Sequence, residues 1–144
     1  MAEFLGTAFL LAAIVGSGIM GERLANGNAA IALLANSIAT GAMLVVLILM
    51  FSPVSGAHFN PVVTLVMAYR NGRPVSEVLQ YVACQVCGAL VVVASANIMF
   101  GLAPFSFSTH VRSGGAQLFS EFVATFGLLA VAVYGFGPRW SPLR

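Results

Sequence analysis

The chain has 144 residues, of which 60% are hydrophobic and 7% are charged, and its mean hydropathy is +0.99. A soluble domain carries about 25% charged residues, so this composition excludes a soluble globular protein and indicates an integral membrane protein in contact with the lipid bilayer. The formal net charge is only +2, from scattered Arg and Glu without Lys or Asp, which excludes a nucleic-acid-binding surface.

Four apolar runs are long enough to cross a bilayer, which takes about 20 residues per helix. They cover residues 4–21, 31–51, 78 to about 100, and about 118 to 137. The opening Met-Ala-Glu lacks the basic start of a secretory signal peptide, so the first run is interpreted as a retained helix. The sequence therefore predicts four transmembrane helices.

The arginines divide unequally between the two sides of this four-helix layout. One side carries Arg70, Arg73, Arg139 and Arg144, and the other side carries Arg23 and Arg112. Because short cytoplasmic loops are enriched in Lys and Arg, both termini are expected in the cytoplasm. The expected location is the cytoplasmic (inner) membrane of a bacterium.

The connection between the second and third runs is unusual. Residues 52–59 (Ser-Pro-Val-Ser-Gly-Ala-His-Phe) contain turn-forming and helix-breaking residues. Asn60 is a favourable helix N-cap, and Pro61 then occupies the first helical position, where its missing N–H costs nothing. Apolar residues follow to about Tyr69, and Arg-Asn-Gly at 70–72 predicts the end of the helix.

This short helix predicts a re-entrant half-helix that enters the membrane from the cytoplasmic side. Nine residues extend about 13 Å, less than half of the ~30 Å hydrocarbon core. Irregular backbone at that depth persists only where protein or a water-filled cavity satisfies its polar groups. Gly56, Ala57, His58 and Phe59 are therefore expected to line a wet path, with their carbonyl oxygens as acceptors and the positive end of the half-helix at the bilayer middle. Such a site accepts neutral hydrogen-bonding solutes and repels cations and protons.

The alternative for this connection is an ordinary cytoplasmic loop followed by an amphipathic surface helix. That helix would need a polar face, and residues 62–67 offer only Thr64. For His58, bracing the loop is as reasonable an expectation as lining the path.

An internal repeat links the two ends of the chain. Residues 2–12 and 120–130 share a Glu-Phe-x-x-Thr start and a Leu-Leu-Ala end at a constant offset of 118 (121 − 3). The pattern predicts one unit of three crossings plus a half-helix at residues 1–118, and the first helix of an incomplete second unit at residues 119–144. Because three crossings is an odd number, the second unit would be inverted in the membrane.

These residues together resemble the aquaporin and aquaglyceroporin family (major intrinsic proteins). The resemblance rests on Glu3 with Thr7, the run Ser-Gly-Ala-His-Phe-Asn-Pro-Val-Val-Thr at 55–64, residues 81–89, and Glu121. It implies an all-α membrane protein with four transmembrane helices plus one re-entrant half-helix, that is, the first repeat and the start of the second inverted repeat. The family's fifth and sixth helices, second Asn-Pro motif and selectivity arginine have no counterpart in the sequence.

The resemblance implies a pore at the half-helix. The side-chain amide of Asn60 would donate a hydrogen bond to the passing solute, and Pro61 and Val62 would adjoin it, with Val62 in place of the family's usual Ala. Thr40, twenty residues earlier, occupies a filter position that is often Phe in water-specific members. The smaller, polar Thr40 predicts a wider filter that passes glycerol, urea or undissociated metalloid acids as well as water.

The resemblance also implies a supporting shell. Glu3 and Glu121 would each accept N–H groups of a re-entrant loop, and Gln85 would support the first of these loops. For Glu3, a charge at the membrane interface is the alternative, and for Glu121 we expect no partner loop within this sequence. Complete members of the family usually assemble as homotetramers with one pore in each subunit.

The leading functional hypothesis is a passive channel for water or small neutral solutes, without enzyme activity, metal or cofactor, present as an incomplete chain unable to conduct alone. A second hypothesis is a non-conducting, membrane-inserted remnant. A third is a four-helix membrane thiol oxidoreductase, suggested by Cys84 and Cys87, but that enzyme would need further cysteines and the sequence has none. Small residues in a spanning helix more often permit close helix packing. A transporter with a broken helix fits the half-helix but not the more specific Asn-Pro run.

Overall fold

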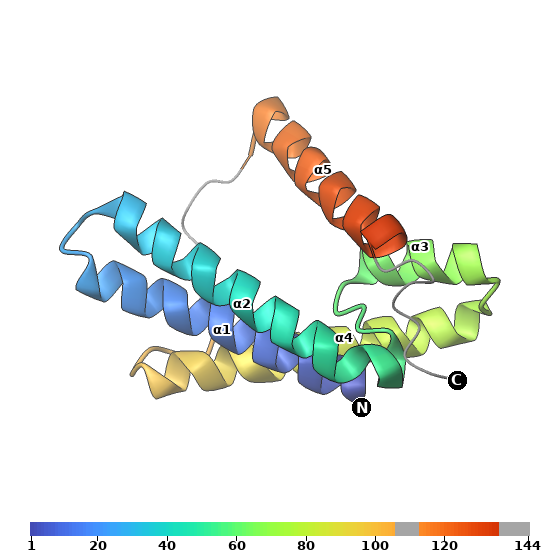
Figure 1. Ribbon diagram of the computed structural model, residues 1–144. Coiled ribbons are helices and arrows are strands. Elements are labelled where there is room, and N and C mark those ends of the chain that lie inside the picture. Colours follow the sequence, from blue (N-terminus) through green and yellow to red (C-terminus); the bar gives the residue numbers. More distant parts are fainter. Residues whose placement is uncertain (106–112, 136–144) are drawn as a thin grey trace.

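The computed structural model describes residues 1–105 and 113–135, and these residues form helices and short connections (Figure 1). Within these residues, four helices are long and apolar enough to cross a membrane: α1 (Ala2–Leu24), α2 (Ala29–Ser55), α4 (Val75–Met99) and α5 (Gly115–Ala130), which continues into the π-helical turn η1 (Val131–Gly135). The shorter helix α3 (Pro61–Asn71) lies between α2 and α4 in the chain. The four membrane helices and the half-helix predicted from the sequence are confirmed.

Some of the sequence predictions lie outside the described residues. These are the end of the fourth apolar run at residue 137 and three of the six arginines used to predict orientation, Arg112, Arg139 and Arg144. The described arginines are Arg23, at the end of α1, Arg70, in the last turn of α3, and Arg73, just after α3.

Helix α1 lies at the centre of the packing, with α2 on one side and α4 on the other, while α3 packs against α4 (Figure 1). The contact between α1 and α4 is close at Gly88, where an added Cβ would lie 2.4 Å from the carbonyl oxygen of Phe4. Small residues permit such approach of helix backbones in membranes. By contrast, α5 stands apart from α1 and α2 in Figure 1, and none of its residues is buried.

The outer surface of the helices is apolar. On α2 alone, the exposed side chains include Leu33, Leu34, Ile38, Val45 and Leu49. A surface of this kind would be an extended apolar patch in water, whereas hydrocarbon solvates it without penalty. The distribution of apolar side chains therefore fits an integral membrane protein.

The end of α2 differs from the sequence prediction. The predicted helix stops at Phe51, but α2 continues through Pro53 to Ser55. Pro53 lies within the last turn, where its missing N–H removes a single intrahelical hydrogen bond. The helix ends instead at Gly56, whose φ of 88° lies in the left-handed region that favours glycine and whose N–H donates to the carbonyl oxygen of Ser52 at 3.0 Å. The irregular segment is therefore shorter than predicted and comprises residues 56–60, named here the re-entrant loop.

Helix α3 begins where the sequence predicts. Asn60 is its N-cap, with the side-chain oxygen accepting a hydrogen bond from the N–H of Val62 at 2.8 Å, and Pro61 occupies the first turn. The helix ends at Gly72, which has a φ of 64°. Its 11 residues extend about 16 Å, or roughly half of a ~30 Å hydrocarbon core.

Candidate functional site

The re-entrant loop has an uncommon backbone conformation. Ala57 and Phe59 both have positive φ angles, 53° and 49°. The left-handed conformation costs a non-glycine residue about 1–2 kcal/mol, so it persists only where the surroundings hold it. The loop therefore needs strong external contacts.

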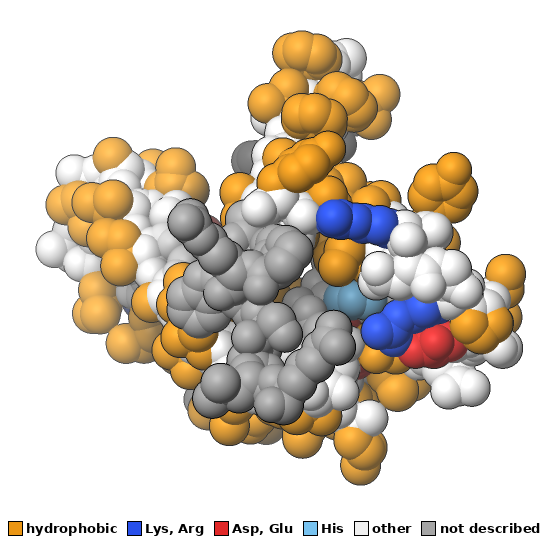
Figure 2. All heavy atoms as spheres, turned by 45° about the vertical axis from the view of Figure 1, so that its right-hand side comes forward, with side chains coloured by type: hydrophobic (Ala, Val, Ile, Leu, Met, Phe, Trp, Pro, Cys, Tyr) orange, Lys and Arg blue, Asp and Glu red, His pale blue; other side chains and the backbone are white. Residues whose placement is uncertain are grey.

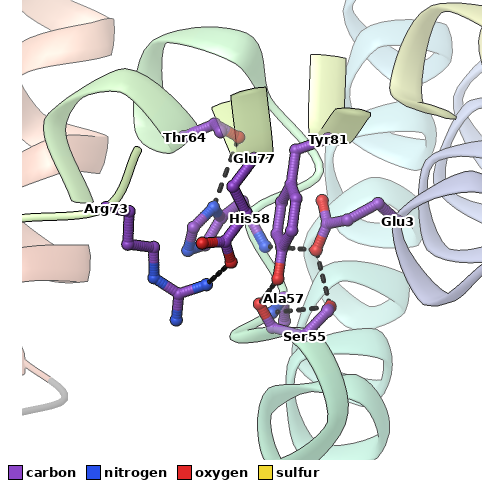
Figure 3. A network of polar contacts seen from close by, with 8 residues as sticks. All are labelled: Glu3, Ser55, Ala57, His58, Thr64, Arg73, Glu77 and Tyr81. Carbon is purple, nitrogen blue, oxygen red and sulfur yellow. Dashed lines mark hydrogen bonds and ion pairs between the residues drawn. The ribbon is translucent and has the colours of Figure 1, made fainter. Parts of the chain in front are cut away.

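The carboxylate of Glu3, on the first turn of α1, provides these contacts. Its Oε1 accepts hydrogen bonds from the hydroxyl of Ser55 at 2.6 Å and from the N–H of His58 at 3.1 Å (Figure 3). Its Oε2 accepts from the N–H of Phe59 at 2.8 Å and from the side-chain amide of Gln85 on α4 at 2.7 Å. Glu3 is only 3% exposed, and four donors compensate the cost of burying a carboxylate.

A second set of contacts fixes the start of α3. The side-chain amide of Gln85 also donates to the hydroxyl of Thr64 at 2.9 Å, and this hydroxyl donates to the carbonyl oxygen of Asn60 at 3.0 Å. The ring Nδ1 of His58 lies 3.3 Å from the same hydroxyl (Figure 3). The side chain of His58 is buried, so it braces the loop from inside and leaves only its backbone for the opposite face.

Tyr81 on α4 connects this network to the charged side chain of Arg73. Its hydroxyl donates to the carbonyl oxygen of Ser55 at 2.9 Å, and its ring lies 5.2 Å from that of His58 (Figure 3). The guanidinium carbon of Arg73 lies 6.0 Å from the centre of the Tyr81 ring, and Arg73 forms an ion pair with Glu77. Figure 2 shows the charged side chains gathered on this face, with hydrophobic side chains over much of the surrounding surface.

The sequence analysis assigned no site role to Ser55, Thr64 or Tyr81. Ser55 and Thr64 are the first and last residues of the run at 55–64, and Tyr81 begins the stretch at 81–89 that contains Gln85. Their presence in those stretches is the signal that could have identified them.

Several hydrogen-bonding groups of the re-entrant loop have no partner among the described residues. The carbonyl oxygens of residues 56–59 accept no hydrogen bond from any described residue, because the loop's contacts use its N–H groups. The amide nitrogen of Asn60 likewise has no described partner, because its cap uses the side-chain oxygen. Pro61 and Val62 are exposed beside it. Gly56 is exposed and Ala57 and Asn60 are half-buried, so their unpaired groups are available to water or a small polar solute, whereas His58 and Phe59 are buried.

Two of the residues predicted from sequence lie outside this network. The hydroxyl of Thr40, in α2, donates to the side-chain oxygen of Asn36 at 3.2 Å. Glu121, on α5, is exposed and has no hydrogen bond to a described residue, although it has the same sequence motif as Glu3. The structure therefore brings together Glu3, Gln85 and the re-entrant loop, but not these two residues.

No group of three His, Cys, Asp or Glu side chains within residues 1–105 and 113–135 is arranged to hold a metal ion. Cys84 and Cys87 on α4 are free thiols, one half-buried and one exposed.

Comparison with known proteins gives concordant matches. The family model described as major intrinsic protein matches residues 1–137. Aquaglyceroporin AqpS of Rhizobium meliloti (strain 1021) is 50% identical over 94% of this chain and 58% of its own length. Aquaporin NIP1-1 of Arabidopsis thaliana and Nodulin-26 of Glycine max are each 33% identical over 91% of this chain, and over 46% and 48% of their own lengths. The chain thus spans about half the length of the curated relatives it matches, and no solved structure matches it.

Proposed function

Because the chain belongs to the major intrinsic protein family, we propose that it contributes to a passive transmembrane channel for water and small neutral solutes. The observation that carries this proposal is the re-entrant loop, in which the N–H groups of His58 and Phe59 donate to Glu3, while the carbonyl oxygens of residues 56–59 and the amide nitrogen of Asn60 have no partner among the described residues. The printed names of the relatives, aquaglyceroporin and aquaporin, support the same function.

The proposed mechanism is exchange of hydrogen bonds along the loop. A solute that gives up water would donate to the free carbonyl oxygens and accept from the Asn60 amide, so that its desolvation cost is offset. The positive N-terminal end of α3 lies at the same point and disfavours cations and protons. No step requires a covalent bond or an energy source, so transport follows the concentration gradient.

We further propose that the solutes include glycerol, urea or undissociated metalloid acids as well as water. The support is Thr40, a small polar side chain at the expected filter position. AqpS, which is 50% identical to this chain, carries the name aquaglyceroporin. Large apolar side chains at that position would narrow the path and remove a hydrogen-bonding group.

The proposed setting is the cytoplasmic membrane of a bacterium, with both termini in the cytoplasm. Arg70 lies in the last turn of α3 and Arg73 just after it, at the end of the molecule where α1 begins (Figure 1), and arginines favour the cytoplasmic side. Residues 1–118 would form the first repeat of the channel, and α5 would open an inverted second repeat in which Glu121 supports another re-entrant loop. Assembly as a homotetramer belongs to the same proposal.

We also propose that residues 1–144 alone enter the membrane without forming a selective pore. Helix α3 extends about 16 Å, so it lines roughly half of a ~30 Å core. A non-conducting membrane protein is therefore the second candidate for this stretch of chain, and the exposed Glu121 favours it.

The experiment compares the purified 144-residue chain with the chain extended through the downstream reading frame, both in lipid vesicles. Stopped-flow light scattering then measures water and glycerol permeability. We expect selective flux from the extended chain only. Selective flux from the 144-residue chain would contradict its inability to conduct alone, and no flux from either would contradict the channel.

The Asn60→Asp variant tests the site itself. Aspartate is also a good N-cap, so α3 should form, but the amide donor is lost and a charge appears in the path. We expect at least a tenfold loss of flux at equal protein insertion. Asn28→Asp is the matched control, because Asn28 caps α2 in the same way, accepting from the N–H groups of Ala30 and Ile31 at 3.1 and 3.2 Å. Equal flux in the two variants would refute the role of Asn60.

A further inference from the structure

A polar contact in the otherwise apolar α2 involves the proposed filter residue. The side-chain amide of Asn36 donates to the carbonyl oxygen of Ile14 on α1 at 3.1 Å, and its oxygen accepts from the hydroxyl of Thr40 at 3.2 Å. Helix α1 leaves room for this amide at Gly18, where an added Cβ would lie 2.9 Å from the Asn36 nitrogen. Asn36 is thus held at both ends of its amide group.

The Thr40 hydroxyl differs from the other helical hydroxyls nearby. A serine or threonine within a helix commonly donates to the backbone carbonyl four residues earlier. Ser17 donates to Ala13 at 2.5 Å and Ser37 donates to Leu33 at 2.8 Å in this way. Thr40 instead donates to the Asn36 side chain, so Asn36 determines where its proton points.

We propose that Asn36 is a positioning residue that makes Thr40 a fixed hydrogen-bond acceptor in the channel filter. This inference rests on the proposed function, which places Thr40 beside the solute. A hydroxyl has one proton and two lone pairs, and Asn36 holds the proton, while no described residue donates to the Thr40 oxygen. The filter would therefore favour solutes that present O–H or N–H groups, such as polyols, amides and undissociated acids. A solute of similar size that only accepts hydrogen bonds, such as dimethyl sulfoxide, would gain nothing there.

A double-mutant cycle separates this role from a merely structural one. The chain extended through its downstream reading frame carries Asn36→Leu, Thr40→Val or both, and the readout is the ratio of glycerol to water permeability. We expect each single variant to lower the ratio about three- to tenfold, the range that one net hydrogen bond supports, with unchanged entry of dimethyl sulfoxide. The double variant should show no further loss, because Asn36 acts through Thr40.

Ser37→Ala is the matched control, because it removes a neighbouring hydroxyl of the same helix that bonds only the backbone. Its permeability ratio should equal that of the unmodified chain. If Asn36→Leu lowers the ratio as much in the Thr40→Val background as in the unmodified chain, Asn36 acts independently of Thr40 and the inference is overturned.

A second measurement does not depend on conduction. Three-bond NMR couplings to Cγ2 of Thr40, in the 144-residue chain in detergent micelles, report its χ1 rotamer. We expect a single rotamer in the unmodified chain and averaged couplings after Asn36→Leu. Averaged couplings already present in the unmodified chain, or couplings unchanged by the substitution, would overturn the inference. An extended chain without flux would refute the proposed function, and the couplings would still decide whether Asn36 fixes Thr40.

Discussion

Replacing Glu3 by Gln should release the re-entrant loop while changing the size of the side chain very little. All four groups around the carboxylate are donors, two on each oxygen. The glutamine amide replaces one of these oxygens by an NH₂ group. In either orientation of the amide, this NH₂ group points at two other donors. The less destabilising orientation is the one in which the NH₂ group faces the Ser55 hydroxyl and the N–H of His58. There the hydroxyl can rotate and accept a hydrogen bond from the NH₂ group.

The magnitude follows from the bonds that are lost. The bond from His58 disappears, and the other bonds weaken because the acceptor is no longer charged. Hydrogen bonds to charged groups contribute about 1.5–3 kcal/mol and neutral ones about 0.5–1.5 kcal/mol. We therefore expect Glu3→Gln to lower the free energy of loop opening by about 2–4 kcal/mol. This corresponds to roughly 30- to 700-fold faster exchange of the amides that Glu3 holds.

The assay is hydrogen exchange at the backbone amides of His58 and Phe59, followed by NMR on the 144-residue chain in micelles. Glu22→Gln is the control, because Glu22 is an exposed residue of the same helix without a hydrogen bond to a described residue. We expect exchange to accelerate in the Glu3 variant only. Unchanged exchange at both amides in Glu3→Gln would refute the role of Glu3 in holding the loop.

Two further predictions concern close packing against α1. Gly88→Ala would place a methyl group 2.4 Å from the carbonyl oxygen of Phe4, so the free energy of unfolding in dodecyl sulfate titrations should fall by about 1–3 kcal/mol. Gly41→Ala, where nothing lies within 4 Å, should not be destabilising, and equal stability of the two variants would contradict the close approach. Gly6→Ala would bring Cβ within 1.9 Å of the Phe59 ring. It should also destabilise the protein, and Phe59→Leu in the same chain should restore most of the loss; a failure to do so would count against this contact.

Local signals made the start of the half-helix predictable. An Asn-Pro pair specifies an N-cap and a first turn through contacts within four residues, and Gly72 supplies the left-handed end. The end of α2 was predicted wrongly. The free-energy cost of a proline inside a helix depends on how many helical residues follow it, and Gly56 ends the helix three residues after Pro53.

Contacts between helices could not be predicted in the same way. The exposed face of α2 is as apolar as the face against α1, so hydrophobic periodicity does not show which way a side chain points. The bonds from Tyr81 to Ser55 and from Asn36 to Ile14 depend on the rotation of each helix about its axis. Glu3 and Glu121 share one motif, yet only the first has donors around it. The motif specifies an acceptor, whereas its partners come from elsewhere in the chain.

The position of Glu3 at the start of the chain also constrains the order of biosynthesis. Its last partner, Gln85, is synthesised 82 residues later, about 4–16 s at the usual ~5–20 residues per second. Ser55, His58 and Phe59 are synthesised 52, 55 and 56 residues after Glu3, so the carboxylate lacks all of its donors for the first part of that interval and lacks Gln85 until its end. A bare carboxylate is costly in hydrocarbon, so the start of α1 must stay near the hydrated lipid headgroups during translation. The complete set of contacts around Glu3 therefore forms only after α4 has been synthesised as far as Gln85.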